Sequence, residues 1–440
     1  MTETKLAAIV MAGGLGTRMR SATPKHLHPI LGRRMVDWVL RSAAPLEPSP
    51  LVLVASPEIK DEFGDIVVAV QERPLGTGDA VRAARAALDD GEGDLLVLSG
   101  DTPLLTADLL VALLETHRRE GAAATLLSFE PDAPRQYGRV VRGRDGRVEA
   151  IVEAVDATPE QLALRECNSS SYVFRAQHLW PTLERLRPAN PQGELYLTDA
   201  VRDLVHHGYA VAAQVAPDPA EAEGVNTRAE LAAAAATLRE RINLAHMLAG
   251  ATIVDPTTTW IEAEVELEPD CIVHPFTVLR GKTRVAARAE IGSHTVAVDA
   301  VIGAGAIIGP FCYLRPGTVL EARAKAGTFV EIKNSHIGAR TKVPHLSYIG
   351  DADIGEDTNI AASNVTVNFA HEPGRSKGRT TIGSNVRTGV DNAFVAPVTI
   401  GDDAWIAAGS VITEDVPPNA LALARAHQVN KEGRGGKRDG

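Results

Sequence analysis

A glycine-rich turn near the amino terminus has the residue types of a phosphate-binding loop. It follows an apolar run and reads Met11-Ala12-Gly13-Gly14-Leu15-Gly16-Thr17-Arg18. Glycines let backbone N–H groups approach a phosphate closely, and the amino end of a following helix favours an anion. Arg18 and Lys25 add positive charge beside the turn. The turn matches neither the Walker motif nor the six-residue dinucleotide motif, and many such turns only reverse the chain.

Asp101 is a candidate metal ligand. It follows Leu98-Ser99-Gly100 at the end of an apolar run. An aspartate just beyond the carboxyl end of a central strand is well placed to hold Mg²⁺ against triphosphate oxygens. The alternative interpretation is a turn-forming residue after Gly100. Together, the glycine-rich turn and Asp101 favour a nucleotide site.

Strand–helix alternation over residues 1–226 must position these groups. Helical patterns separate short apolar runs, and this alternation predicts a mostly parallel sheet covered by helices. The helical patterns are Gly78–Leu88 and Ala107–Arg119. The runs that we expect to form buried strands are Leu6–Val10, Leu51–Val54, Ile66–Val70, Leu95–Leu98 and Ala124–Phe129.

A different periodicity begins near residue 251, where aliphatic residues return at every sixth position. Period six is neither helical nor simple strand alternation, and it is typical of a parallel β-helix built from hexapeptide turns. Three such series can be followed, and in the last of them Thr388 takes one position that an aliphatic residue would otherwise fill. The three series are Val273, Leu279, Val285, Ile291; Ile302, Ile308, Leu314, Leu320; and Ile382, Thr388, Phe394, Ile400, Ile406, Ile412.

The segment between the two patterns is rich in alanine, leucine, arginine and glutamate, a composition that favours helix. We predict one long helix over Thr227–Leu248, either as a linker or as part of the first domain's outer layer. The predicted domains are therefore residues 1–226, a helical linker at 227–250, and residues 251–440. From about residue 428 the chain is expected to be a disordered tail.

Bulk composition narrows the class of protein. The 440 residues are 45% hydrophobic and 23% charged, as in an ordinary globular protein. The net charge of −11 argues against general nucleic-acid binding. Three cysteines, Cys167, Cys271 and Cys312, have no metal-ligand or disulfide spacing, which suits a reducing compartment. We read no export signal and no membrane span, and these features predict a cytoplasmic protein.

Further motifs then follow in a recognisable order. In residues 1–226 they are Gly16–Met19, Ser21–Lys25, His28–Gly32, Leu75–Ala80, Leu98–Leu104, Tyr137–Val140, Ile151–Glu153, Glu166–Asn168, Gly193–Asp199 and Glu223–Asn226. In the second half they are Arg315–Gly317, Phe329–Lys333 and His345–Asp351. Over nearly the whole chain the sequence resembles the bifunctional bacterial family N-acetylglucosamine-1-phosphate uridylyltransferase / glucosamine-1-phosphate N-acetyltransferase, which makes UDP-N-acetylglucosamine for cell-wall precursors.

The resemblance implies an α/β fold. A Rossmann-like nucleotidylyltransferase domain is followed by a left-handed parallel β-helix of hexapeptide repeats. It also implies a cytoplasmic homotrimer assembled through the β-helix, with small molecules as its other partners and no nucleic acid or membrane.

In the first domain the resemblance implies uridylyl transfer from UTP to N-acetylglucosamine-1-phosphate. The sugar phosphate would attack the α-phosphorus in line and release pyrophosphate, with Arg18 and Lys25 neutralising charge. Mg²⁺ would lie at Asp101 and Asn226. The nucleotide contacts implied are Met11, Ala12, Gly13, Gly14, Lys25, Gln71, Gly76, Thr77, Ser99 and Gly100. The implied sugar contacts are Gly138, Glu153 and Asn168.

In the β-helix the resemblance implies acetyl transfer from acetyl-CoA to glucosamine-1-phosphate. An amine attacking a thioester needs a base of near-neutral pKa, which suits His345, and Glu331 could orient the imidazole. A lone histidine is more often structural. The implied sugar-phosphate contacts are Arg315, Lys333, Tyr348 and Asn359. The implied acetyl-CoA contacts are Ala362, Asn368, Phe369, Val390, Ala408 and Arg425.

Several positions depart from the family pattern. Gly13 and Leu15 occupy positions where the family more usually has alanine and a basic residue. Ser169-Ser170 replaces the expected Thr-Gly beside the sugar contacts. The sugar, gluco- or galacto-configured, therefore stays open.

Three more departures lie in the β-helix. Phe369 replaces the family's tyrosine, and Val390 replaces a serine that could donate to the thioester carbonyl. Loss of such a donor typically costs about a hundredfold in rate. The stretch 370–378 is longer than the family's loop. The basic residues Arg375–Arg379 are either a grip on the CoA phosphates or a solvated face.

Two alternative functions remain. One is a monofunctional nucleotidylyltransferase whose β-helix only forms a trimer or acetylates another amino-sugar phosphate; the presence of His345 disfavours the scaffold. The other is a regulatory subunit, and intact Lys25, Asp101 and Asn226 disfavour it.

Overall fold

The computed structural model describes residues 4–14, 16–88, 92–134, 136–188, 193–369 and 377–432. Leu15, most of the long loop (370–376) and the end of the predicted tail (433–440) lie outside the described residues. The chain forms two compact units, Met1–Leu238 and Arg239–Gly440.

The division between the units falls within helix α7, Arg228–Leu248. In its first half Ala234 and Leu238 pack with Met35 of the first unit, whereas Asn243 in its second half donates to the carbonyl oxygens of Pro256 and Thr259 in the second. One helix therefore lies where the alanine-rich composition predicts it, and each half packs within its own unit.

The first unit is built on one mixed sheet. Seven strands form its main path, in the order β11-β7-β10-β6-β1-β4-β5, and β8 and β9 extend it from β10. Six of the seven path strands share a direction, and β10 alone is antiparallel to both its neighbours, so the predicted mostly parallel sheet is confirmed. The strands are β1 Leu6–Ala12, β4 Leu51–Ala55, β5 Val67–Val70, β6 Asp94–Ser99, β7 Ala124–Phe129, β8 Arg139–Arg142, β9 Val148–Val152, β10 Cys167–Arg175 and β11 Val211–Val215, with a separate hairpin of β2 Pro29–Ile30 and β3 Arg33–Arg34.

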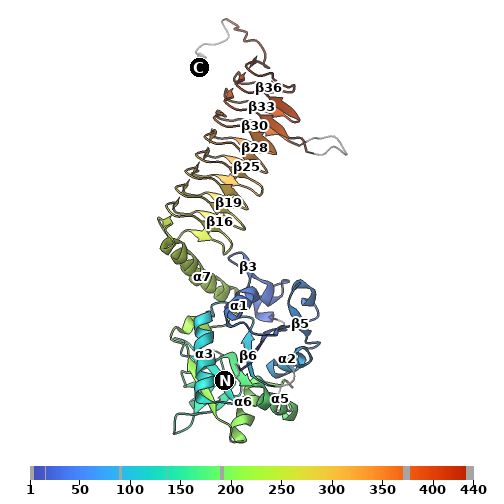
Figure 1. The fold of residues 1–440 in the computed structure, drawn as a ribbon, viewed down its shortest axis with the longest axis vertical. Coiled ribbons are helices and arrows are strands. Elements are labelled where there is room, and N and C mark those ends of the chain that lie inside the picture. Colours follow the sequence, from blue (N-terminus) through green and yellow to red (C-terminus); the bar gives the residue numbers. More distant parts are fainter. Residues whose placement is uncertain are drawn as a thin grey trace, which may run out of the picture. The chain divides into compact units, whose positions relative to one another are not determined.

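Helices cover both faces of this sheet (Figure 1). Alternation along β1 shows why: Ile9 packs on one face with residues of α2, α5 and α6, and Val10 packs on the other with residues of α1 and α3. The carboxyl ends of the shared-direction strands therefore meet at one uncovered edge. The helices are α1 Met35–Ala43, α2 Thr77–Ala83, α3 Ala107–Glu120, α4 Pro159–Leu162, α5 Ala176–Arg185 and α6 Leu197–His206.

The second unit is a left-handed parallel β-helix, with successive coils stacked from β16 to β36 in Figure 1. Its strands form three long parallel sheets and a short one. The first sheet holds β12 Thr252–Ile253, β15 Ile272–Val273, β18 Glu290–Ile291, β21 Ile307–Ile308, β24 Lys325–Thr328 and β27 Lys342–His345. The second holds β13 Trp260–Ile261, β16 Val278–Arg280, β19 Val296–Val298, β22 Tyr313–Leu314, β25 Glu331–Lys333, β28 Tyr348–Gly350, β30 Val365–Val367, β33 Ala393–Val395 and β36 Val411–Ile412. The third holds β14 Glu266–Leu267, β17 Arg284–Val285, β20 Val301–Ile302, β23 Val319–Leu320, β26 His336–Ile337, β29 Ala352–Ile354, β31 Thr380–Ile382 and β34 Val398–Ile400; the short sheet holds β32 Arg387–Thr388, β35 Trp405–Ile406 and β37 Leu421–Ala422.

The period-six residues fill the interior of this prism. Every member of the three predicted series is buried, including Thr388 at 9% exposure. Three short strands complete one coil, so a residue at every sixth position points inward, and residues one coil apart stack on each other. The sequence periodicity thus predicted the core as well as the fold class.

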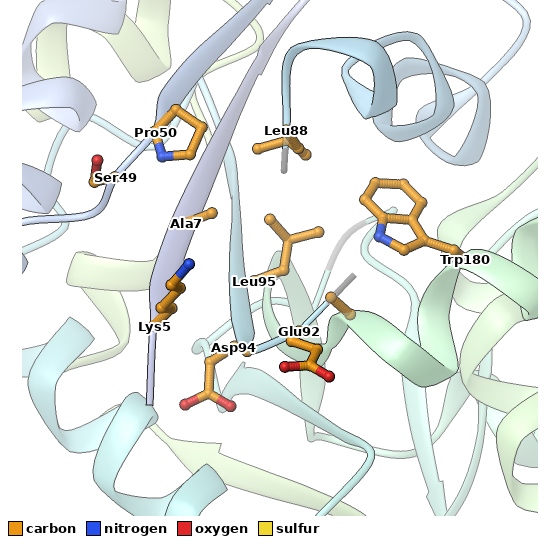
Figure 2. Close-up of a pocket in the computed structure, with 11 residues that line it drawn as sticks. Lys5, Ala7, Ser49, Pro50, Leu88, Glu92, Asp94, Leu95 and Trp180 are labelled. Atoms are coloured by element: carbon orange, nitrogen blue, oxygen red, sulfur yellow. The ribbon is translucent and has the colours of Figure 1, made fainter. Parts of the chain in front are cut away.

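Three smaller findings complete the description. Within the described residues, no helix is long and apolar enough to cross a membrane. Cys167, Cys271 and Cys312 are buried free thiols. Figure 2 shows a small cavity of about 40 Å³ beside Lys5 and Asp94, at the amino ends of β1 and β6. That edge is opposite the one where substrates bind in open α/β sheets.

Candidate active sites

The glycine-rich turn follows directly from the end of β1. A side chain at Gly13 would place its Cβ 2.5 Å from Oε1 of Gln71, so this glycine makes room for the glutamine. Gln71 in turn donates to the carbonyl oxygen of Gly76 at 3.1 Å and to Asp79 at 3.0 Å. Gly76 has φ +102°, and a Cβ there would meet the carbonyl oxygen of Leu195 at 2.5 Å. Three predicted nucleotide contacts therefore lie together at the carboxyl edge.

Lys25 is the centre of a charged cluster beside this turn. Its side chain is only 8% exposed and pairs with the carboxylate of Asp101. Its ammonium also donates to Oδ1 of Asn226 at 2.7 Å, and Arg18 donates to the same oxygen at 2.8 Å. Ser99 donates to Asp101 at 2.6 Å. The structure thus brings together five residues separated by up to 208 positions in the chain.

Burial alone would raise the pKa of Asp101, but the charge of Lys25 and the hydrogen bonds from Lys25 and Ser99 together outweigh it and hold that pKa at about 2. Asp101 is therefore a carboxylate at any physiological pH.

The donor set of this cluster fits Mg²⁺. Asp101 and Asn226, the two predicted metal ligands, both direct oxygens at one cationic group, the Lys25 ammonium. Carboxylate and amide oxygens suit Mg²⁺, which usually takes one or two protein ligands and completes its shell with phosphates and water. A larger cluster is not needed, and the described residues contain no group of three histidine, cysteine or acidic side chains arranged for a metal.

A cleft of about 480 Å³ opens beside the charged cluster. It contains Asp101 and Asn226 as well as all three predicted sugar contacts, Gly138, Glu153 and Asn168. The cleft also includes Arg18, Thr77, Ser99, Gln136, Tyr137, Ser169, Ser170, Gly224 and Glu230. Predicted nucleotide and sugar groups therefore share one cavity.

Glu153 and Asn168 are held in place within the cleft. Burial raises the pKa of the Glu153 carboxyl, which accepts a hydrogen bond from Thr198 at 3.1 Å. The Asn168 amide donates to the Tyr172 hydroxyl at 2.7 Å and accepts from the Ser170 backbone N–H at 3.2 Å.

In the β-helix, two predicted phosphate contacts lie on successive coils. Arg315 and Lys333 follow directly after Leu314 and Ile332, which pair between β22 and β25. Arg315 donates to Oε1 of Glu331 at 2.8 Å. No hydrogen bond joins Glu331 to His345 among the described residues, so the predicted orienting role of Glu331 stays a prediction.

Asp351 organises a second group of predicted contacts. Its buried carboxylate accepts from Asn334 at 2.6 Å and from Asn368, whose amide also lies 3.4 Å from the Tyr348 hydroxyl. Burial raises the pKa of Asp351, but these two amide donors and nearby lysines bring it below its usual value.

Lys377 belongs to the same group. It lies against Lys333, whose proximity lowers the pKa of the Lys377 amine. Two ammonium groups held this close are a favourable place for a dianion such as a sugar phosphate.

His345 begins a column of predicted acetyl-CoA residues along one corner of the prism. His345 pairs with Thr328 of the preceding coil. Lys342 pairs with Asn359 of the following coil, so Ala362, three residues after Asn359, lies at the same corner as His345. The backbone N–H of Asp391 donates to the carbonyl oxygen of Ala362, which places Val390 one coil beyond Ala362. The N–H of Gly409 donates to the carbonyl oxygen of Val390, which places Ala408 in the coil after that. Arg425 donates to the Ala408 carbonyl at 2.8 Å. Phe369 is 60% exposed.

The comparisons with known proteins agree with this geometry. Residues 8–194 match the MobA-like NTP transferase domain. The chain is 48% identical to the bifunctional protein GlmU of Mycobacterium tuberculosis (strain ATCC 25177 / H37Ra), over 97% of this chain and 91% of the relative. It is also 48% identical to the bifunctional protein GlmU of Streptomyces coelicolor, over 97% and 93%. The chain belongs to the bifunctional GlmU family. This confirms the predicted family, fold class and enzyme class, a bifunctional transferase.

For this GlmU family member, sequence reasoning missed three residues that the structure brings into the sites. Lys377 lay within a basic run whose role was open. The hydroxyl of Tyr137 accepts a hydrogen bond from the backbone N–H of Gly224 at 3.2 Å, and Gly224 lies two residues before Asn226 in the chain. An aromatic residue directly before Gly138 was the available signal.

His26 is the third missed residue. It is 4% exposed, and burial lowers its pKa to about 4, so the ring is neutral. A Cβ on Gly100 would lie 3.2 Å from its Nδ1, so the glycine makes room for the imidazole beside Asp101.

Proposed function

We propose that the enzyme makes UDP-N-acetylglucosamine in two steps. The β-helix acetylates glucosamine-1-phosphate from acetyl-CoA, and the first unit then transfers a uridylyl group from UTP to the product and releases pyrophosphate. The observation that carries the second step is the Lys25–Asp101–Asn226 cluster, two of whose members, Asp101 and Asn226, line a cleft of about 480 Å³. We assign uridylyl transfer to a domain of residues 1–226 and acetyl transfer to a domain of residues 251–440.

Uridylyl transfer needs positioning and charge neutralisation rather than covalent catalysis. An oxygen of the sugar phosphate attacks the α-phosphorus of UTP, and the bond from that phosphorus to the bridging oxygen breaks. Arg18 and Lys25 stabilise the negative charge on the departing pyrophosphate. Asp101 and Asn226 would hold Mg²⁺, which when bound neutralises further phosphate charge. Glu153 and Asn168 orient the acceptor sugar.

Acetyl transfer needs a base. His345 takes a proton from the ammonium of glucosamine-1-phosphate, and the amine attacks the thioester carbonyl. The carbon–sulfur bond breaks, and the CoA thiolate leaves and takes up a proton. Arg315, Lys333 and Lys377 bind the sugar phosphate. The carboxylate of Glu331 orients His345 in this proposal.

We further propose that the β-helix assembles as a homotrimer. Four aromatic rings stack along one corner: Phe276 on His294 at 4.8 Å, His294 on Phe311 at 4.8 Å, and Phe311 on Phe329 at 5.4 Å. The three phenylalanines are 47–58% exposed, and Leu346 beside His345 is 59% exposed. Such a continuous apolar row supports contact with another copy of the chain. Sedimentation of Phe311→Asp, compared with the unchanged protein, tests this: the trimer is expected to dissociate.

An assay in two stages tests the function. Purified protein, glucosamine-1-phosphate and acetyl-CoA without UTP should release free thiol, and His345→Ala should abolish that release. Addition of UTP and Mg²⁺ should then release pyrophosphate. No thiol release, with N-acetylglucosamine-1-phosphate still uridylylated, would reduce the β-helix to a scaffold or to a different acyl transfer.

The three buried thiols support a reducing compartment, and we propose that both steps take place in the cytoplasm.

A further inference from the structure

Ser170 has an unusual backbone conformation for its place in the fold. Among the described residues of the first unit, four that are not glycine have left-handed φ: Arg20, Leu31, Glu47 and Ser170. The first and third close short 3₁₀ turns, and Leu31 lies between the strands of a hairpin. Ser170, with φ +61°, lies within β10. Left-handed φ in a residue with a side chain costs free energy, and such strain concentrates at functional sites.

The strand is irregular at the same place. The register between β10 and β7 shifts between Asn168 and Tyr172. The shift leaves the Ser170 N–H directed to Oδ1 of Asn168. Since the other end of the Asn168 amide is bound to Tyr172, both polar atoms of this predicted sugar contact already have protein partners.

The neighbouring hydroxyls, in contrast, are available. Ser169 and Ser170 both lie against the cleft, beside Glu153. The Ser169 hydroxyl is buried and has no hydrogen-bond partner in the described part of the chain. Ser170 is half-buried, and within the described residues its hydroxyl makes no hydrogen bond to the protein. A polar group shielded from water without a partner is costly until a ligand supplies one.

We infer that Ser170 determines which sugar phosphates the cleft accepts, by a hydrogen bond from its hydroxyl to the pyranose ring substituents of the acceptor. The family pattern has Thr-Gly at positions 169–170, and a glycine at position 170 would have no hydroxyl to offer the sugar. A site that hydrogen-bonds a substrate hydroxyl discriminates strongly against a sugar lacking it, because the protein group is then left unpaired. The inference rests on the proposed uridylyl transfer.

Two substitutions test it. Ser170→Ala keeps the Cβ and removes the hydroxyl, whereas Ser170→Gly removes both and adopts left-handed φ without strain. Both are expected to raise the KM for N-acetylglucosamine-1-phosphate about two- to tenfold, as loss of one neutral hydrogen bond does, and to leave the KM for UTP unchanged. Ser170→Gly should not lower the melting temperature. Ser171→Ala, which removes a fully buried hydroxyl outside the cleft, is the matched control and should change neither KM.

A panel of acceptors makes the result specific. The ratio of kcat/KM between N-acetylglucosamine-1-phosphate and its galacto-configured epimer, or glucose-1-phosphate, should fall at least twofold in Ser170→Ala. Unchanged ratios in both variants would overturn the inference, as would an equal loss with every acceptor. Failure of the proposed function is distinguishable, because the unchanged protein would then release no pyrophosphate with any of these sugars.

Discussion

Replacement of Lys25 by alanine should nearly abolish uridylyl transfer and leave acetyl transfer intact. The Lys25 ammonium is the one cation that contacts both Asp101 and Asn226 among the described residues, and it is almost shielded from water. Alanine removes that charge from the place where we expect the triphosphate of UTP to bind.

The structure sets the magnitude. Loss of one preorganised charge-stabilising donor in a reacting site typically costs about a hundred- to a thousandfold in kcat, or about 3–4 kcal/mol. Stability should fall as well. Asp101 would keep Ser99 as its remaining hydrogen-bond donor to the side chain in the described structure. Because its carboxylate is 18% exposed, loss of the countercharge should cost less than the roughly 3–5 kcal/mol typical of a fully buried pair.

The assay compares pyrophosphate release and thiol release on the same purified protein. Thiol release from the β-helix is an internal control for folding and concentration, since Lys25 lies in the other unit. Double replacement of Lys25 by alanine and Asp101 by asparagine separates the two effects. It should recover part of the lost melting temperature, because no unpaired charge remains, and none of the lost activity.

Two results would refute this reasoning. A Lys25→Ala variant with pyrophosphate release within about threefold of the unchanged protein would show that Lys25 does not stabilise the reacting phosphates. A double variant that regains activity would show that Lys25 serves only to neutralise Asp101.

Three further predictions follow from individual contacts. Burial raises the pKa of Glu153, so the folded state keeps the proton of this carboxyl to higher pH than the unfolded chain, and stability rises as pH falls through the folded pKa. Glu153→Gln should therefore raise the melting temperature at pH 8, flatten the dependence of stability on pH and weaken acceptor binding. An unchanged dependence of melting temperature on pH would contradict this. Asp351→Asn should destabilise the β-helix by about 2 kcal/mol in urea denaturation, because an amide would face the Asn368 donor, and should slow thiol release alone. Val390→Ser should raise the rate of thiol release about tenfold or more by restoring a donor in the column of His345, and a rate at or below that of the unchanged protein would exclude this role.

Several features of this protein follow from local sequence alone. The β-helix core is one, because a hexapeptide turn repeats its own geometry, so Ile302 and Ile308 point inward wherever the coil lies in the stack. The glycine-rich turn is another, since an apolar run followed by Gly13, Gly14 and Gly16 is recognisable within a few residues. The contacts that require glycine at 13 and 76, with Gln71 and Leu195, form only in the packed domain. Asp101 and Asn226 were recognisable from motif order, and the structure places their side chains on one cation.

Tertiary structure decided the rest. The antiparallel insertion of β10 between β7 and β6 depends on long-range strand pairing, which no local pattern encodes. The left-handed Ser170 lies in that strand, where its register with β7 shifts. Lys377 meets Lys333 only because the chain returns to the same corner two coils later. The neutrality of His26 likewise has its origin in burial, a property of the packed molecule. Local conformational preference acts over a few residues, whereas burial and the meeting of distant side chains exist only once the whole sheet or prism has formed.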